Sequence, residues 1–445
     1  MKTCLSVLWA VTALAANAAA QPAPASAPTN RVAITSALIA QLAGEARTNH
    51  PAFRAADARV DAAIFNVQTV RQWEDPMAKF GVNQTSPRSF KTSDEGDLTY
   101  GVEQKLPLWG KPELNRRVAI AEAATEKATV AARVQLWRRD IAKALFRIAL
   151  AERVIEVGEQ DQAWLETIIA VTEEKYRAGM ATQFDVLVPQ NEKAKRADQL
   201  RTERSKLVHE RLTLNRLLNR DLHAPWPGFE LPILAAPIPF TPRLTELAIK
   251  FEPKLLVMRQ EKNQADAATQ LARRQRLPDV SAGVEGRQYS GDGGFREGMF
   301  TVSLNLPWFN RDRYRSGVRR EEAKTRAVEA DLADLALAVQ EEVHHLTVGI
   351  DAARREALLY RDEILPRTRQ ALASAGAAWE TNRGLLRDVL DARRMLLEGE
   401  LMAARAVTEQ YLMMAELASC CGIGDLKSLP AVSVGGEPTA APAKP

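Results

Sequence analysis

Few residues of this 445-residue sequence have the types and spacing that chemistry requires. It contains no glycine-rich dinucleotide loop, no phosphate-binding lysine loop, no nucleophile elbow and no His-Glu-x-x-His zinc motif. The neighbouring His344 and His345 would point about 100° apart on a helix, so they do not form a chelating pair. We therefore expect no enzyme activity and no cofactor.

Cysteine is the other residue type that could hold a metal. Cys420 and Cys421 are adjacent and lie close to Met413 and Met414, a combination that would suit a soft metal. A disulfide between adjacent residues is strained, and no third or fourth ligand is spaced nearby. We expect no metal site.

The N-terminus has the pattern of a secretory signal peptide over residues 1–20. Lys2 precedes an apolar stretch that ends at a small-residue cleavage site between Ala20 and Gln21. Cys4 lies too early to carry a lipid anchor after cleavage. Residues 21–34 are rich in proline, alanine and serine, and are expected to form a flexible lead. The sequence thus predicts an exported protein.

The bulk composition is that of a polar, helical chain. Its 60 Lys and Arg nearly balance its 56 Asp and Glu, so phosphate attraction to nucleic acid is not indicated. Beyond the first 20 residues, no run of about 18 apolar residues could cross a bilayer as a helix. Such averages do not register membrane strands that alternate polar and apolar residues.

The sequence contains an internal repeat with an offset of about 200 residues. An offset of 202 relates Pro76 to Pro278 and Gly81-Val82 to Gly283-Val284. An offset of 200 relates Val102, Leu106 and Pro107 to Val302, Leu306 and Pro307. An offset of 203 relates Asp185-Val186-Leu187 to Asp388-Val389-Leu390. A nearly constant offset over so long a stretch indicates two halves with one architecture.

The repeat defines the expected domains. The first repeat spans residues 35–220 and the second spans 243–424. A proline-rich connector, 221–242, is expected to be extended because its prolines exclude a helix. The tail, 425–445, has low complexity and is expected to be disordered.

Each half is expected to contain one helix, two strands and then long helices. The first helices are expected from about Thr35 to Trp73 and from about Arg243 to Gln275. The long helices carry apolar or small residues every seven positions, from Val134 to Ile169 and from Ala336 to Ala371. Sustained heptads specify a left-handed coiled coil, and a helix of about 60 residues is about 90 Å long.

Between the helices the apolar period changes to two. The expected strands span about 77–85, 97–106, 279–289 and 298–307. Their charged residues lie on one side and are assigned to a wet barrel lumen: Lys79, Glu103, Lys105, Glu285 and Arg287. Such strands fit a membrane barrel, and two amphipathic hairpins on a soluble helical protein are the alternative.

Four strands do not close a barrel, because about eight is the practical minimum. Open edges are not tolerated in lipid, so membrane strands of this chain must be pooled with those of other copies. Two chains would give eight strands and three would give 12, and only the larger number leaves an open pore.

These features resemble the TolC-type outer-membrane efflux family over nearly the whole mature chain. The resemblance rests on the two-fold repeat and on four segments: VEQKLPLWGKPELNRR, VSLNLPWFNRDRYR, YRAGMATQFDVL and WETNRGLLRDVLDA. The LPLWGK stretch is most similar to the metal-exporting branch of CusC-like and CzcC-like proteins. The resemblance implies a mainly α fold with a small β part. Long coiled-coil helices would form a periplasmic α-barrel, and each chain would add four strands to a trimeric 12-stranded outer-membrane β-barrel.

The resemblance also implies a function and partners. The chain would be the passive exit duct of a tripartite efflux system in the outer membrane of a Gram-negative bacterium, with most of its mass in the periplasm. It would form a homotrimer, contact outer-membrane lipid, and dock to a periplasmic adaptor (membrane fusion) protein. The inner-membrane pump, such as a resistance-nodulation-division exporter of heavy metals or drugs, would be reached mostly indirectly. The alternatives are the outer duct of a type I protein secretion system and a soluble periplasmic coiled-coil or adaptor protein.

The resemblance assigns a gate to the second helical tip. Asp388 and Asp391 match an aspartate pair that closes the periplasmic end of the channel. Three copies would bring six carboxylates near one axis and favour cations.

Contacts between helices at the gate are expected at Asp185, Trp379 and Arg383. Trp379 replaces the usual tyrosine, and Gly384 stands at the usual arginine position, so the details of these contacts differ from the family pattern. The turns expected to dock the adaptor comprise Gly179, Met180, Ala181, Gly384 and Leu385.

Overall fold

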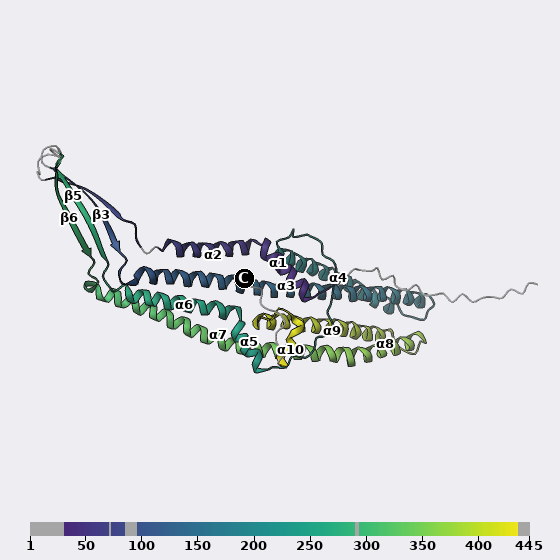
Figure 1. The fold of residues 1–445 in the computed structure, drawn as a ribbon. Coiled ribbons are helices and arrows are strands. Elements are labelled where there is room, and N and C mark those ends of the chain that lie inside the picture. The colour runs from purple at the N-terminus through teal and green to yellow at the C-terminus, as the bar shows by residue number, and fades with distance from the viewer. Residues whose placement is uncertain (1–30, 71–72, 85–95, 290–292, 435–445) are drawn as a thin grey trace, which may run out of the picture.

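The computed structural model describes residues 31–70, 73–84, 96–289 and 293–434. The molecule is elongated, with a sheet at one end, helical hairpins at the other and long helices side by side between them (Figure 1). None of the helices in these ranges is both long and apolar enough to cross a membrane. The predicted signal peptide, 1–20, lies outside the described residues.

The first helix of each repeat is broken, so the single helices predicted from Thr35 to Trp73 and from Arg243 to Gln275 are wrong. The first repeat has α1 (Ser36–Asn49) and α2 (Pro51–Thr69), and the second has α5 (Pro242–Phe251) and α6 (Pro253–Arg274). In both repeats a proline begins the second helix. Because a residue before proline avoids the helical conformation, His50 and Glu252 are non-helical and end the preceding helix.

Long helices make up the rest of each repeat. They are α3 (Lys111–Arg177), α4 (Gln183–Leu218), α7 (Arg311–Leu359), α8 (Leu365–Glu380) and α9 (Leu386–Cys420). With 67 residues, α3 is about 100 Å long.

One π-helical turn, Tyr360–Ile364, joins α7 to α8. Leu365 N–H there donates to the carbonyl oxygen of Tyr360, five residues back. Pro366 follows directly, and since it has no N–H, the local widening carries the helix past the missing hydrogen bond.

The sheet joins the two repeats. Its strands are β2 (Met77–Gln84), β3 (Gly96–Leu106), β5 (Val280–Tyr289) and β6 (Phe295–Leu304), in the order β2-β3-β5-β6, and every pair is antiparallel. The central pair, β3 and β5, comes from different repeats and sets Val102 opposite Val284.

The fourth strand begins and ends three residues earlier than the predicted 298–307. Phe295 already pairs with Gln288 beyond an irregularity at Arg287/Gln288. At the other end Asn305 accepts a hydrogen bond from Asp279 N–H at 2.6 Å, and a 3-10 helix begins at Pro307.

Two segments that were expected to be irregular contribute to the fold. β1 (Val32–Ala33), in the predicted flexible lead, pairs in parallel with β4 (Phe229–Glu230) of the proline-rich connector. The tail has regular structure as far as residue 434: a 3-10 turn at Leu426–Ser428 is followed by α10 (Leu429–Val434). Predicted disorder from residue 425 is therefore wrong for ten residues, because the apolar side chains of Leu429 and Val432 are fully buried.

Each repeat has its own core at mid-length. In the first, α1, α2, α3 and α4 meet around Phe53, Ile141 and Leu214. In the second, α5, α7, α9 and α10 meet around Leu244, Val343 and Leu417.

Glycines allow the long helices to approach closely. A Cβ on Gly158 of α3 would lie 2.7 Å from Leu200 Cδ2 of α4, and a Cβ on Gly349 of α7 would lie still closer to the sulfur of Met413 on α9. Both distances are below van der Waals contact, so these positions exclude any larger residue unless the neighbour moves.

A buried carboxylate clamps the two hairpins together. Asp161 of α3 is 3% exposed; it accepts from Arg196 Nε of α4 at 2.9 Å and from Arg393 Nε of α9 at 2.8 Å. The Arg393 guanidinium also lies 5.1 Å from the ring centre of Trp164. Three helices from both repeats thus share one ion-paired carboxylate.

The close approach of α3 and α4 predicts the effect of filling it. Gly158→Val should lower the free energy of unfolding by about 1–3 kcal/mol, because the added methyls overlap a buried leucine. Gly317→Ala in α7 is the control, since no atom lies within 4 Å of its added Cβ. It should be neutral or stabilising by roughly 0.5–1 kcal/mol. Urea unfolding followed by circular dichroism measures both, and equal stability of the two variants would contradict the packing argument.

The clamp predicts a second stability difference. Asp161→Ala should destabilise the protein by about 3 kcal/mol, because two partly buried guanidinium groups lose their counter-charge. Arg204→Gln is the matched control, since it breaks an exposed pair between the same helices, Arg204–Glu159 at 2.7 Å. That change should cost about 0–1 kcal/mol. A loss for Asp161→Ala as small as that of the control would show that the clamp does not hold the hairpins.

Candidate functional site

The polar face of the sheet gathers all five residues assigned to a barrel lumen. Alternation along paired strands places these side chains on one side, where they form ion pairs across strands. Lys79 pairs with Glu103 and lies 3.6 Å from Glu285. Lys105 and Arg287 complete the set, at 2.7 Å from Glu74 and 2.7 Å from Asp97 respectively.

The opposite face of the sheet is apolar and uncovered in the single chain. Phe80 is 81% exposed, Phe300 69% and Val284 64%. Their neighbours on this face are also exposed: Val82, Leu98, Tyr100, Val102, Val302 and Leu304. An exposed apolar face of this size, backed by an ion-paired face, is a surface made for contact with another apolar phase.

The tip turns lie at the end of the molecule far from the sheet (Figure 1). In the first, Gly179 has φ +72° and Met180 N–H donates to Lys175 at 2.8 Å. In the second, the left-handed residue is Asn382, at φ +57°, which is Gly179 displaced by the repeat offset of 203. Gly384 is needed for close packing rather than for a left-handed turn, since a Cβ there would lie 2.9 Å from the Ala378 side chain.

The tips present apolar side chains to solvent. Met180, Phe184 and Leu187 of the first tip and Leu385 of the second are exposed. Ala181 lies between them in the first turn and is partly buried.

Within the single chain, Asp185 and Trp379 do not contact each other, although contacts between helices were expected at both residues. Asp185 instead caps its own helix, accepting from Thr182 N–H at 2.9 Å and from the Thr182 hydroxyl at 2.7 Å. Trp379 contacts Lys175, whose Nζ lies 4.3 Å from the ring centre and donates to the Trp379 carbonyl at 2.8 Å. Arg383 is exposed. Lys175 was missed; its place in the last turn of α3 is visible in the sequence, but its contact with Trp379, 204 residues away, is not.

The gate aspartates are accompanied by arginines. Asp388 is exposed in the first turn of α9. Asp391 lies 3.1 Å from Arg394 and 3.6 Å from Arg387. Arg394 also reaches Glu192 of α4 at 2.6 Å. The arginines are spaced at i−4 and i+3 from Asp391, a spacing that the sequence already contained. The second tip therefore carries mixed charge.

Cys421 is buried and Cys420 is half-buried, and both lie near the carboxyl group of Glu252. Cys421 is 2% exposed and its Sγ lies 3.6 Å from the Leu244 carbonyl oxygen. Burial raises the pKa of Cys421 to about 12 and raises the pKa values of Cys420 and Glu252 as well. The thiols are therefore protonated and poor ligands at neutral pH. Within the part of the chain that the structure describes, no group of three or more His, Cys, Asp or Glu is placed to hold a metal ion.

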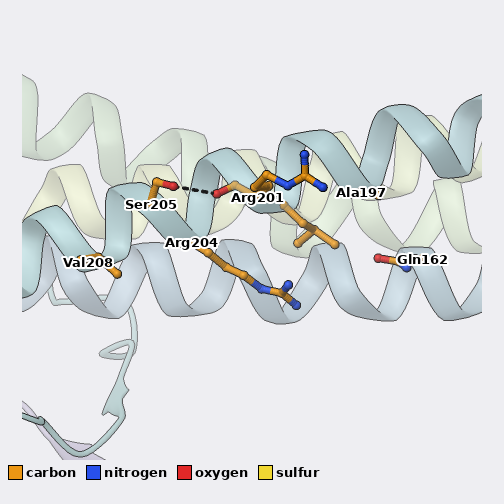
Figure 2. A pocket seen from close by; sticks show the side chains of 7 residues that line it. Gln162, Ala197, Arg201, Arg204, Ser205 and Val208 are labelled. Carbon is orange, nitrogen blue, oxygen red and sulfur yellow. Dashed lines mark hydrogen bonds between the residues drawn. The ribbon is translucent and has the colours of Figure 1, made fainter.

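A groove of about 410 Å³ lies between α3 and α4 (Figure 2). Figure 2 shows Arg204 of α4 reaching over α3, the helix that carries Gln162, whereas Arg201 points away from α3; the Ser205 hydroxyl donates to the Arg201 carbonyl. Arg204 is paired with Glu159. Because the serine is bonded to its own helix and no base lies beside it, the groove has the character of a helix interface rather than a catalytic pocket.

Comparison with known proteins agrees with this arrangement. The profile of the outer membrane efflux protein family matches residues 42–220 and 244–422, one match to each repeat. Among curated protein sequences there is no significant match.

Solved structures with the same fold are outer-membrane channels. The outer-membrane channel OprN superposes with a TM-score of 0.76 at 16% identity, over 87% of this chain and 90% of that one. The outer membrane protein VceC from Vibrio cholerae gives 0.73 at 19%, over 87% and 96%. CusC, whose title concerns transmembrane channel formation, gives 0.75 at 14%, over 86% and 91%. The likeness to CusC is no greater than that to OprN, so it does not single out the metal-exporting branch.

The predicted fold class, mainly α with a small β part, is confirmed by these structures. The resemblance read from the sequence is confirmed by the profile, which covers most of the chain in two consecutive matches. This protein belongs to the outer membrane efflux protein family.

Proposed function

We propose that this chain is the outer-membrane exit duct of a tripartite efflux system and works as a homotrimer. The observation that carries the proposal is the two-faced sheet, with ion pairs on one side and exposed Phe80 and Phe300 on the other. Lipid covers the apolar side, and the ion-paired side faces water. Three copies supply 12 strands, enough for an open lumen.

The helical body continues this lumen. Each strand pair leads into a long helix through one short 3-10 helix, β3 into α3 and β6 into α7. At about 100 Å, α3 alone is long enough to carry the duct far from the membrane. Membership of the family makes the chain a passive channel rather than an enzyme, so the energy for export comes from a partner.

The partner that joins the duct is a periplasmic adaptor, which binds the two tips. Exposed Met180 and Leu385 provide apolar contacts there, close to the exposed cations Arg383 and Arg387. The adaptor links the duct to an inner-membrane pump, so the pump contacts this chain mostly indirectly.

Cell fractionation tests the proposal. The protein should be found in the outer-membrane fraction of a Gram-negative host and migrate as an oligomer on a gel until the sample is heated. A known periplasmic protein from the same cells is the control for fraction purity. A monomer in the soluble periplasmic fraction would refute the exit duct and favour a coiled-coil or adaptor protein.

The mixed charge at the second tip predicts opposite effects of two substitutions on ion selectivity. Asp388→Ala should lower the preference for cations, because it removes an exposed carboxylate from the constriction. Arg387→Gln should raise that preference, because Asp391 loses a neighbouring cation. Reversal potentials in planar bilayers under a salt gradient measure both effects.

Arg204→Gln, which alters the groove between α3 and α4, is the control and should leave the reversal potential unchanged. Unchanged selectivity in the Asp388→Ala variant would remove Asp388 from the gate. A fall rather than a rise in Arg387→Gln would show that this arginine does not offset Asp391.

A further inference from the structure

The outer edges of the sheet indicate how neighbouring copies join, an inference that rests on the proposed homotrimer. Within residues 73–84, 96–289 and 293–434, β2 and β6 are each paired along one edge only. In a bilayer the N–H and C=O groups of those free edges have no water to bond, so they require another strand. The strands of the chain alternate in direction, so an antiparallel join of β6 to β2 of the next copy continues the pattern.

The two faces of the sheet limit the register of this join. Lys79 of β2 shares the polar face with Glu103, and Ser303 of β6 donates to that same Glu103 at 2.8 Å. Odd-numbered residues therefore face the polar side on β2 and, from Glu297 onward, on β6. A shift of one residue would place the polar side chains of one copy in line with the apolar side chains of the next.

The pairing inside the chain provides the template. Where the two repeats meet, β3 and β5 place Val102 opposite Val284. Where two copies meet, the equivalent strands are β6 and β2, because the repeat offset of 200 carries Val102 to Val302 and that of 202 carries Val82 to Val284. The junction between copies thus repeats the junction between halves.

We propose that β6 of one copy pairs antiparallel with β2 of the next, with Val302 opposite Val82. The same register places Ser303 opposite Gly81 and Asn305 opposite Lys79. The polar face then continues across the junction without a break, with Lys79 of each copy beside the polar edge of its neighbour.

Barrel geometry agrees with this register. Along a line at right angles to the strands, the observed pairs place Met77 beside Glu103, then Gly283, then Thr301. The proposed pairing then leads to position 83 of the next copy, six residues further along β2. Three copies give a stagger of about 18 residues, or about 60 Å, against a summed width of about 58 Å for 12 strands measured at right angles to them.

The resulting strand tilt is about 45°, at the upper end of the range for barrels. A register two residues further along would tilt the strands by about 54°, which is too steep. A register two residues shorter would give a strand tilt of about 35°, which also lies within that range. Between these two registers, the correspondence of the repeats selects the one that pairs Val302 with Val82.

Cysteine cross-linking tests the register in the full-length protein in its own membrane. The double variant Val82→Cys with Val302→Cys should form covalent dimers and trimers when oxidised with copper phenanthroline. Directly opposite Cα atoms are about 4.5–5.5 Å apart, within disulfide reach, whereas diagonal neighbours are about 7–8 Å apart. Two slipped pairs are the matched controls: Phe80→Cys with Val302→Cys, and Val82→Cys with Leu304→Cys. All of these positions lie on the apolar face.

Each variant is first checked for assembly by its heat-dependent migration under reducing conditions, and the unsubstituted chain controls for Cys420 and Cys421. Preferential cross-linking of the 82/302 pair, reversed by reductant, supports the register. Preferential cross-linking of either slipped pair, or none in variants that assemble, overturns the register and leaves the exit duct standing. An unsubstituted chain that never forms an oligomer overturns the proposed function itself.

Discussion

The pairing of β3 with β5 is the contact on which the rest of this structure depends. It joins strands from two repeats into one four-stranded sheet, and α3 and α6 then pack side by side below it. The sheet has one apolar face and one ion-paired face, and this difference fixes the register of its strands. Among the described residues this four-stranded sheet is open at both edges, and the proposed pairing with other copies follows from those open edges.

The helical part of the molecule is held together by different interactions from those of the sheet. Its helices approach closely at Gly158 and Gly349, and the buried Asp161 holds three of them through two guanidinium groups. Toward the tips the contacts become exposed and mixed in charge, as around Asp391. The hairpins are thus joined by buried ion pairs below the turns and by exposed ion pairs close to them.

Much of the fold was predictable because it is written in local patterns. The alternation around Lys79 and Glu103 and the long heptad helices depend on residues close in sequence, and the repeat offset is found by comparing the sequence with itself. The breaks at His50 and Glu252 were missed although proline marks both, and the ordered turn around Leu429 was missed because its burial depends on distant helices. The contact of Lys175 with Trp379, 204 residues apart, could not be assigned from spacing alone.

The position of α9 has a consequence for how the chain reaches its final state. Ala415 of α9 belongs to the core of the first repeat, while Leu417 belongs to that of the second, together with Leu429. The first core therefore remains incomplete until α9 has been made, and the second until α10 has been made. Such a high contact order slows folding and prolongs the time during which the sheet edges and the unfinished cores are exposed.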